Sequence, residues 1–338
     1  MKAVNCKGDV NSTDSHRRWT WTVVRVVASC AALIWVVHVT PLATVIGTLQ
    51  GSRLPLVALG VLMNVATRVA AAERTLVMNQ GLGLSVSRWQ TLETLFISNF
   101  YALLSPGPWL SGAVSVYRYK SFGTSVTGGV SSLLASRGVE FVLIIVWGMV
   151  CALLDPRVPM ASLRLPLWLA VLGLAAAVCG MAVWLIVHRA FKASGFERNG
   201  VVLWRHRVFA KAAEVWTQIL AQGPGVALKA SIPASIQALL SGAALMVLAH
   251  ALQIDLSWTS GVWISAVVYA VVLLPISIAG LGIREITLVK CFALLGYAPR
   301  AAVAVSVLLF LDQLVSALIG GLLQIGSVIV RARQVSRF

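Results

Sequence analysis

Apolar runs of about 20 residues recur along the whole chain, and a helical run of that length crosses a hydrocarbon core of about 30 Å. Hydrophobic residues make up 59% of the 338 residues and charged residues only 11%, whereas a soluble domain carries about 25% charged residues. The longest stretch that could lie in water, residues 189–224, is too short for an independent catalytic domain. The sequence therefore predicts an all-α protein, a polytopic transmembrane helical bundle.

The apolar runs predict six full spans, at residues 19–39, 54–72, 127–154, 166–187, 230–252 and 301–330. The first is interpreted as a signal anchor, because no small-x-small cleavage site precedes the next helix. Residues 1–18 are then a polar cytoplasmic segment and residues 331–338 a basic cytoplasmic tail. Residues 19–330 form one transmembrane domain, in which residues 189–224 are a cytoplasmic loop with an amphipathic helix.

The net charge of +16 is distributed as the positive-inside rule requires. Polar ends and loops assigned to the cytoplasmic side contain most of the 27 Lys and Arg residues, whereas those assigned to the outer side contain only Arg53, Arg157, Arg164 and Arg300. This asymmetry predicts an inner-membrane protein with both termini in the cytoplasm. It explains the charge without a nucleic-acid partner, and it favours contact with anionic lipid head groups.

Two apolar segments are interrupted by Pro and Gly in their middle. Residues 91–117 are broken at Pro106, in the run Ser-Pro-Gly-Pro, and residues 262–295 are broken between Pro275 and Gly282. Pro removes a backbone donor, and irregular backbone at membrane depth is tolerated only inside protein or beside a wet cavity. The first segment is predicted to be a re-entrant hairpin. The second is either a similar hairpin, with six full spans in total, or a pair of spans, with eight.

Both broken segments show the same order of residues: Pro, Gly, Arg, a second Gly, and then a span rich in small residues that carries a charge. The first series is Pro106, Gly112, Arg118, Gly123 and Arg137, and the second is Pro275, Gly280, Arg284, Gly296 and Asp312. The first would begin and end inside the cell, and the second outside. Such units of opposite orientation indicate an inverted repeat and a transporter with a site near the midplane. Chance similarity is the alternative, because the spacings differ.

Charged residues inside apolar segments are candidates for a site, since each costs at least ~2.5–3.5 kcal/mol at the bilayer centre. Arg137 and Glu140 share one helical face, and either they neutralise each other or the guanidinium binds a phosphate. Arg284 is expected near the start of a resumed half-helix, where exposed N–H groups favour an anion. Glu285 is expected to point in a different direction from Arg284.

The remaining intramembrane charges have less definite interpretations. Asp312 has no oppositely charged neighbour in the sequence, so it is expected to pair with Arg284 or Lys290, or else to be protonated. Arg25 reaches the interface by snorkelling and is interpreted as structural. Arg68 lies deeper, and a structural and a functional role are both retained for it. Glu73 and Arg74 follow just beyond it, near the predicted cytoplasmic face.

These motifs resemble those of a known family. Residues 90–140 carry Asn99, Pro106, Gly112, Arg118, Gly123 and Arg137, and residues 275–285 read Pro-Ile-Ser-Ile-Ala-Gly-Leu-Gly-Ile-Arg-Glu. The chain thereby resembles the lysylphosphatidylglycerol synthase transmembrane region, also called the flippase-like family, without the synthase domain. Departures from the family pattern are Ala113-Val114 and Asp312. The resemblance implies movement of an anionic phospholipid or an isoprenoid-linked (glyco)lipid between membrane leaflets.

Residues and resemblance together give a candidate lipid-binding set: Arg118, Arg137, Arg284, Glu140, Glu285, Asp312, Asn99, Pro275, Gly280 and Gly282. No metal site is expected, because the five Cys and five His are dispersed. No catalytic residue or cofactor is expected either, because the sequence shows no nucleophile with an adjacent base and no phosphate-binding Gly-rich loop. One alternative to transport is an integral-membrane enzyme in which an intramembrane carboxylate such as Glu140, Glu285 or Asp312 transfers a group to a lipid carrier. Such enzymes generally place the catalytic carboxylate in an aqueous loop, and the outer loops offer only Asp155 and Asp255. Another is a non-catalytic membrane subunit. A homo-oligomer is also left open.

Overall fold

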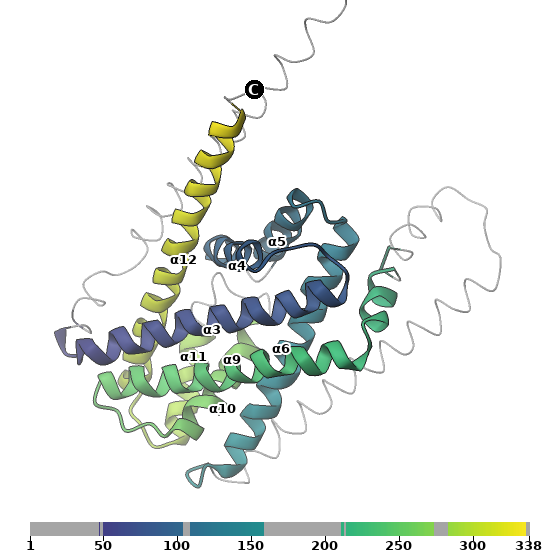
Figure 1. Cartoon of the computed structure of the whole chain (residues 1–338). Helices are drawn as coiled ribbons and strands as arrows, with labels where there is room; N and C mark the ends of the chain where they lie inside the picture. Colours follow the sequence, from purple (N-terminus) through teal and green to yellow (C-terminus); the bar gives the residue numbers. More distant parts are fainter. Residues whose placement is uncertain are drawn as a thin grey trace, which may run out of the picture.

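The structure, a computed structural model, describes residues 50–103, 109–158, 211–212, 214–273 and 283–335, together with Gly47. All the regular elements in these residues are helices, and Figure 1 shows their arrangement. In chain order they are α3 (Leu54–Gly81), α4 (Arg88–Ala102), α5 (Trp109–Ser121), α6 (Val126–Leu154), α9 (Gly223–Ala251), α10 (Trp258–Val272), α11 (Ile283–Leu294) and α12 (Pro299–Val335). The predicted all-α class is confirmed for these residues.

Four of the helices, α3, α6, α9 and α12, are long and apolar enough to cross a membrane. They coincide with four of the six predicted spans, so the prediction of a multi-pass membrane protein is confirmed. The other two predicted spans, residues 19–39 and 166–187, lie outside the described residues. So do residues 1–18 and most of the predicted loop at 189–224. Helix α12 continues to Val335, into the predicted basic tail.

The predicted end of the second span, at residue 72, is wrong. Helix α3 continues for a further two and a half turns to Gly81. The adjacent charges Glu73 and Arg74 were interpreted as the membrane interface. Arg74 is instead 2% exposed and is satisfied by other helices, so the helix has no reason to stop there.

The four remaining helices are too short to cross a bilayer, which takes about 20 residues. Helices α4 and α5 have 15 and 13 residues, and α10 and α11 have 15 and 12. The members of each pair contact each other, as they would in the arrangement with two hairpins. The predicted breaks, at Pro106 and at residues 275–282, fall between the members of these pairs but lie outside the described residues.

The order long, short, short, long occurs twice, in α3–α6 and in α9–α12, and the connections also match. After α3 the chain turns at Gly83 with φ +68°, and after α9 it turns at Gln253 with φ +61°. Gln253 is the one non-glycine residue with a positive φ in the described part of the chain. The serines that follow, Ser87 and Ser257, each accept a hydrogen bond of 3.2 Å from a backbone N–H in the next helix. Such N-caps satisfy a donor that the helix leaves open.

The two halves run in opposite directions against each other. Helices α3 and α9 lie antiparallel along their length (Figure 1): Arg53 N–H donates to the Ala251 carbonyl at 2.9 Å at one end, and Gly81 meets Val226 at the other. The ends predicted to face outside therefore meet each other, as do the ends predicted to face inside.

The first short helix of each half packs on the last long helix of the other half. Helix α4 lies against α12, where Gly320 faces the backbone of Phe96. Helix α10 lies against α6, where Gly148 faces Ala266. Because glycine has no Cβ, it allows this close approach of backbones, as small residues generally do between membrane helices.

Candidate functional site

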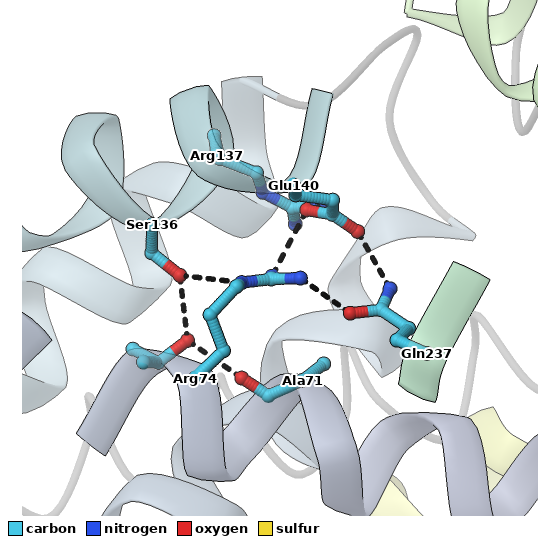
Figure 2. A network of polar contacts seen from close by, with 7 residues as sticks. Ala71, Arg74, Ser136, Arg137, Glu140 and Gln237 are labelled. Carbon is cyan, nitrogen blue, oxygen red and sulfur yellow. Dashed lines mark hydrogen bonds and ion pairs between the residues drawn. The ribbon is translucent and has the colours of Figure 1, made fainter. Parts of the chain in front are cut away.

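A network of charged and polar side chains lies between three of the long helices (Figure 2). Arg74 of α3 is its centre. The guanidinium donates through Nε to Ser136 at 3.0 Å and through Nη2 to Glu140 at 3.0 Å, and it also donates to Gln237 of α9. Ser136 and Glu140 belong to α6. We call these residues, together with Arg137, the central network.

Glu140 binds two arginines at once. It lies near the middle of the 29 residues of α6, and its Oε2 atom is 3.0 Å from Arg74 and 2.9 Å from Arg137. Its other oxygen accepts a hydrogen bond of 2.7 Å from Gln237. The ion pair expected from the spacing of Arg137 and Glu140 is therefore present. The network as a whole holds two guanidinium groups and one carboxylate, which leaves one positive charge in excess.

The two arginines differ in exposure. Arg74 is enclosed by the three helices, whereas 46% of the Arg137 side chain is exposed. Arg137 lies on the same face of α6 as the exposed Leu134, three residues before it. The excess charge is therefore accessible only through Arg137.

Sequence reasoning missed Arg74, which was assigned to the cytoplasmic end of the second span. One signal could have found it. Thr67, Ala71, Arg74 and Met78 recur at helical spacing, and all four are buried. A cation on the buried face of a helix requires a partner within the protein, and Glu140 is that partner.

Arg284 and Glu285 form a second ion pair, on α11, at 2.9 Å. The expectation that they point in different directions is wrong. Glu285 accepts a hydrogen bond of 2.6 Å from Ser306 of α12. The Arg284 side chain lies on the same side of α11, where it pairs with Glu285 and donates a hydrogen bond of 3.3 Å to Gln313. The Arg284 guanidinium also lies 5.9 Å from the ring centroid of Phe310, within the range of a cation–π contact.

Asp312 does not form the ion pair expected for it. Arg284 pairs with Glu285 instead, and Lys290 is exposed. Asp312 is 4% exposed, and its Oδ1 atom has no hydrogen-bond partner in the described part of the chain. Arg68 and Arg284 both act on it electrostatically.

The other members of the predicted set lie apart from these pairs. Arg118 of α5 pairs with Glu93 of α4 at 2.8 Å and donates to Thr94 at 3.3 Å, so it joins the two short helices. Asn99 lies on α4, and its Nδ2 atom has no hydrogen-bond partner among the described residues. Pro275, Gly280 and Gly282 lie outside the described residues.

The carboxylates proposed for the enzyme alternative are mostly held by the scaffold. Glu140 and Glu285 are each bound to a guanidinium. Asp155, at the end of α6, accepts hydrogen bonds from Ser260 and, at 3.1 Å, from the indole of Trp263. Among the described residues no three His, Cys, Asp or Glu side chains converge on a metal position. What the geometry offers is a set of arginines held by carboxylates within the helical bundle.

Comparison with known proteins agrees with the resemblance noted from the motifs. A search of curated proteins finds no match for the chain. The family model of the lysylphosphatidylglycerol synthase TM region matches residues 22–321. The match includes all eight described helices except the last turns of α12. This chain belongs to the lysylphosphatidylglycerol synthase transmembrane-region family.

Proposed function

We propose that this protein moves a phosphate-bearing lipid between membrane leaflets, with Arg137 as the cation that receives the phosphate. The family and the membrane-spanning helices support a lipid-related function. The observation that carries the proposal is the charge of the central network, in which one carboxylate serves two arginines. Because buried Arg74 already neutralises Glu140, the positive charge of Arg137 is available to bind a phosphate.

The position of Arg137 suits a lipid head group in transit. Helix α6 spans about 43 Å at 1.5 Å per residue, and Arg137 is the twelfth of its 29 residues. A phosphate at that depth has lost water, which is prohibitive unless another group replaces the hydration. A guanidinium replaces it with two parallel donors in a fixed plane, which an ammonium group lacks.

Arg284, the first choice from sequence, is less available than Arg137 in this conformation. Its guanidinium is engaged by Glu285, Gln313 and the Phe310 ring, and its side chain is buried. It requires a rearrangement of these contacts before it can bind a lipid. We assign it to a later step of the same path, with Arg118 as a third cation.

In this proposal the transport path lies between two structural repeats of the chain. We assign α3–α6 and α9–α12 to two inverted repeats, and the two short pairs to re-entrant hairpins. The antiparallel packing of α3 and α9, and the packing of α4 on α12 and of α10 on α6, support this assignment. Transporters built in this way bind their cargo near the midplane, at the interface of the repeats.

Lipid movement in liposomes tests the proposal. The purified protein is reconstituted with a trace of fluorescent phosphatidylglycerol, and movement is followed by bleaching of the outer leaflet. We expect Arg137→Gln to slow movement roughly ten- to a hundredfold, since a hydrogen bond to a charged group contributes about 1.5–3 kcal/mol. The variant should fold normally, because Glu140 keeps Arg74 and Gln237. Arg300→Gln, the same change at an exposed residue, is the matched control. Wild-type rates in Arg137→Gln would refute the phosphate role.

Sidedness is tested by cysteine labelling in a variant without the native cysteines. We place the protein in the inner membrane with both termini in the cytoplasm, so the turn after α9 faces outside and the start of α4 faces inside. Asp255 and Arg88 are 91% and 79% exposed. In intact cells Asp255→Cys should react with an impermeant maleimide, whereas Arg88→Cys should react only after permeabilisation. The reverse pattern would invert every assignment of sides.

A further inference from the structure

The second half of the protein has no counterpart of the central network. Glu140 follows the positive-φ Gly123 at the same distance in sequence as Gln313 follows the positive-φ Gly296. Arg74 likewise precedes the positive-φ Gly83 by the same number of residues as Ala244 precedes the positive-φ Gln253. Where the first half has a buried ion pair, the second half therefore has a neutral amide and a methyl group. The polar groups around these positions, on α12 and on the adjacent α3, are consequently not held by such a pair.

Several of these polar groups lack partners. Asp312 and Ser316 are one turn apart on α12, and Asn64 and Arg68 are one turn apart on α3. Within the described residues Asp312 Oδ1, Ser316 Oγ, Asn64 Nδ2 and Arg68 Nε have no hydrogen-bond partner. Asp312 and Ser316 are 4% and 1% exposed. Buried polar groups are nearly always satisfied in proteins, so a group of unsatisfied ones requires an explanation.

These groups belong to one region of the bundle. Helix α12 packs on α3 and α4, and Ala317, next to Ser316, contacts Phe100, next to Asn99. Asp312 interacts electrostatically with Arg68 from α3 and with Arg284 from α11. The other charged groups on the helices that pack against α12 are paired elsewhere or exposed. The pairs are Glu285 with Arg284, Glu93 with Arg118, His250 with Asp255, Glu73 with Arg88 and Arg74 with Glu140, and the exposed groups are Arg53, Lys229 and Lys290. The remaining titratable groups on these helices are the buried free thiol of Cys291 and the phenol of Tyr101.

We propose that Asp312 is a proton-binding site, and that its protonation couples lipid movement to the proton gradient across the membrane. The coupling rests on the proposed function, whereas proton binding does not. In the ionised state the carboxylate attracts the guanidinium of Arg68 or Arg284. When Asp312 takes a proton from water on one side, that attraction ends and the arginine is released to the lipid phosphate. When the proton leaves to water on the other side, the arginine returns and the lipid is released.

The chemistry at this position favours a proton over a metal cation. A proton needs one carboxylate oxygen, whereas Na⁺ needs several oxygen ligands and would be repelled by Arg68 and Arg284. Charge balance also favours a proton, because one proton moving with one singly charged anionic lipid transfers no net charge across the membrane. Ionisable residues inside membrane helices commonly form such proton relays.

Proton binding is measured without lipid transport, as the infrared difference spectrum of the protein between acidic and alkaline buffer. We expect a carbonyl band of a protonated carboxyl group in the wild-type protein and in Asp312→Glu. The band should be lost in Asp312→Asn, which retains the shape of the side chain and should fold. Asp255→Asn, at an exposed carboxylate, is the matched control and should keep the band. A band that is unchanged in Asp312→Asn would overturn the proposal.

Coupling is measured in the same liposomes with a proton gradient imposed. We expect the gradient to drive net accumulation of the fluorescent phosphatidylglycerol in one leaflet with the wild-type protein. Asp312→Asn should lose this response, and Asp312→Glu should keep it. A response retained in Asp312→Asn, or one that follows only a sodium gradient, would overturn coupling through Asp312. If the wild-type protein moves no lipid while the infrared band still depends on Asp312, the transport function fails and the proton site stands.

Discussion

Replacing Glu140 with Gln is expected to lower the free energy of unfolding by about 3–5 kcal/mol, the range found when one member of a buried ion pair is removed. Glu140 is the only carboxylate in the central network, and it binds Arg74 and Arg137 at 3.0 and 2.9 Å. Gln leaves both guanidinium groups without a counter-ion, and Arg74 has no route to water. Thermal unfolding of the purified protein in detergent measures the loss.

The same network predicts an order among the variants. Arg74→Gln should be milder than Glu140→Gln, because Glu140 then keeps Arg137 and Gln237. The double variant Arg74→Gln/Glu140→Gln should be more stable than the sum of the single effects, since no buried charge is left unpaired. Glu73→Gln removes a carboxylate that is 42% exposed from its pair with exposed Arg88, and it should change stability by less than about 1 kcal/mol. If Glu73→Gln and Glu140→Gln lowered the free energy of unfolding by similar amounts, the central network would not be the cause of the destabilisation in Glu140→Gln.

Gly320→Val is expected to prevent α4 from packing on α12, and so to abolish a stable fold. A Cβ atom at Gly320 would overlap the carbonyl oxygen of Phe96 and lie 2.7 Å from its carbonyl carbon. Overpacking of a core typically costs about 1–3 kcal/mol when side chains can shift. Here the obstacle is backbone, which shifts only if the helix moves, so we expect the effect to exceed that range.

Gly326→Val is the matched control for Gly320→Val. Both glycines lie on α12, and no atom lies within 4 Å of the position a Cβ would take at Gly326. We therefore expect Gly326→Val to elute like the wild-type protein in size-exclusion chromatography, whereas Gly320→Val should aggregate. A monodisperse Gly320→Val with an unchanged melting temperature would mean that α4 and α12 are not in close contact.

The membrane class and the positions of the spans were predictable from sequence for a physical reason. A bilayer requires a run of about 20 apolar residues for each crossing, and this requirement acts on each segment by itself. Four predicted spans accordingly coincide with α3, α6, α9 and α12. Pro and Gly in the broken segments likewise act locally, and the helices around them end near Ala102 and Val272.

Within one helix, side-chain partners could also be predicted. Arg137 and Glu140 are three residues apart on α6, a spacing that places them on one face, and they form an ion pair. The structure added Arg74, which comes from another helix. Its hydrophobic surroundings in sequence gave no indication of which helix would supply the counter-ion.

The sequence by itself determined a multi-pass helical membrane protein with interrupted segments and a set of intramembrane charges. Tertiary structure alone decided which charged side chains pair. Glu140 binds Arg74 as well as Arg137, and Arg284 binds Glu285, whereas the Oδ1 atom of Asp312 has no hydrogen-bond partner in the described part of the chain. The reason is that hydrophobicity and helical period are properties of one segment. The partner of a long, flexible arginine depends on the angle and register at which separate helices pack, and these follow from the contacts of the whole bundle.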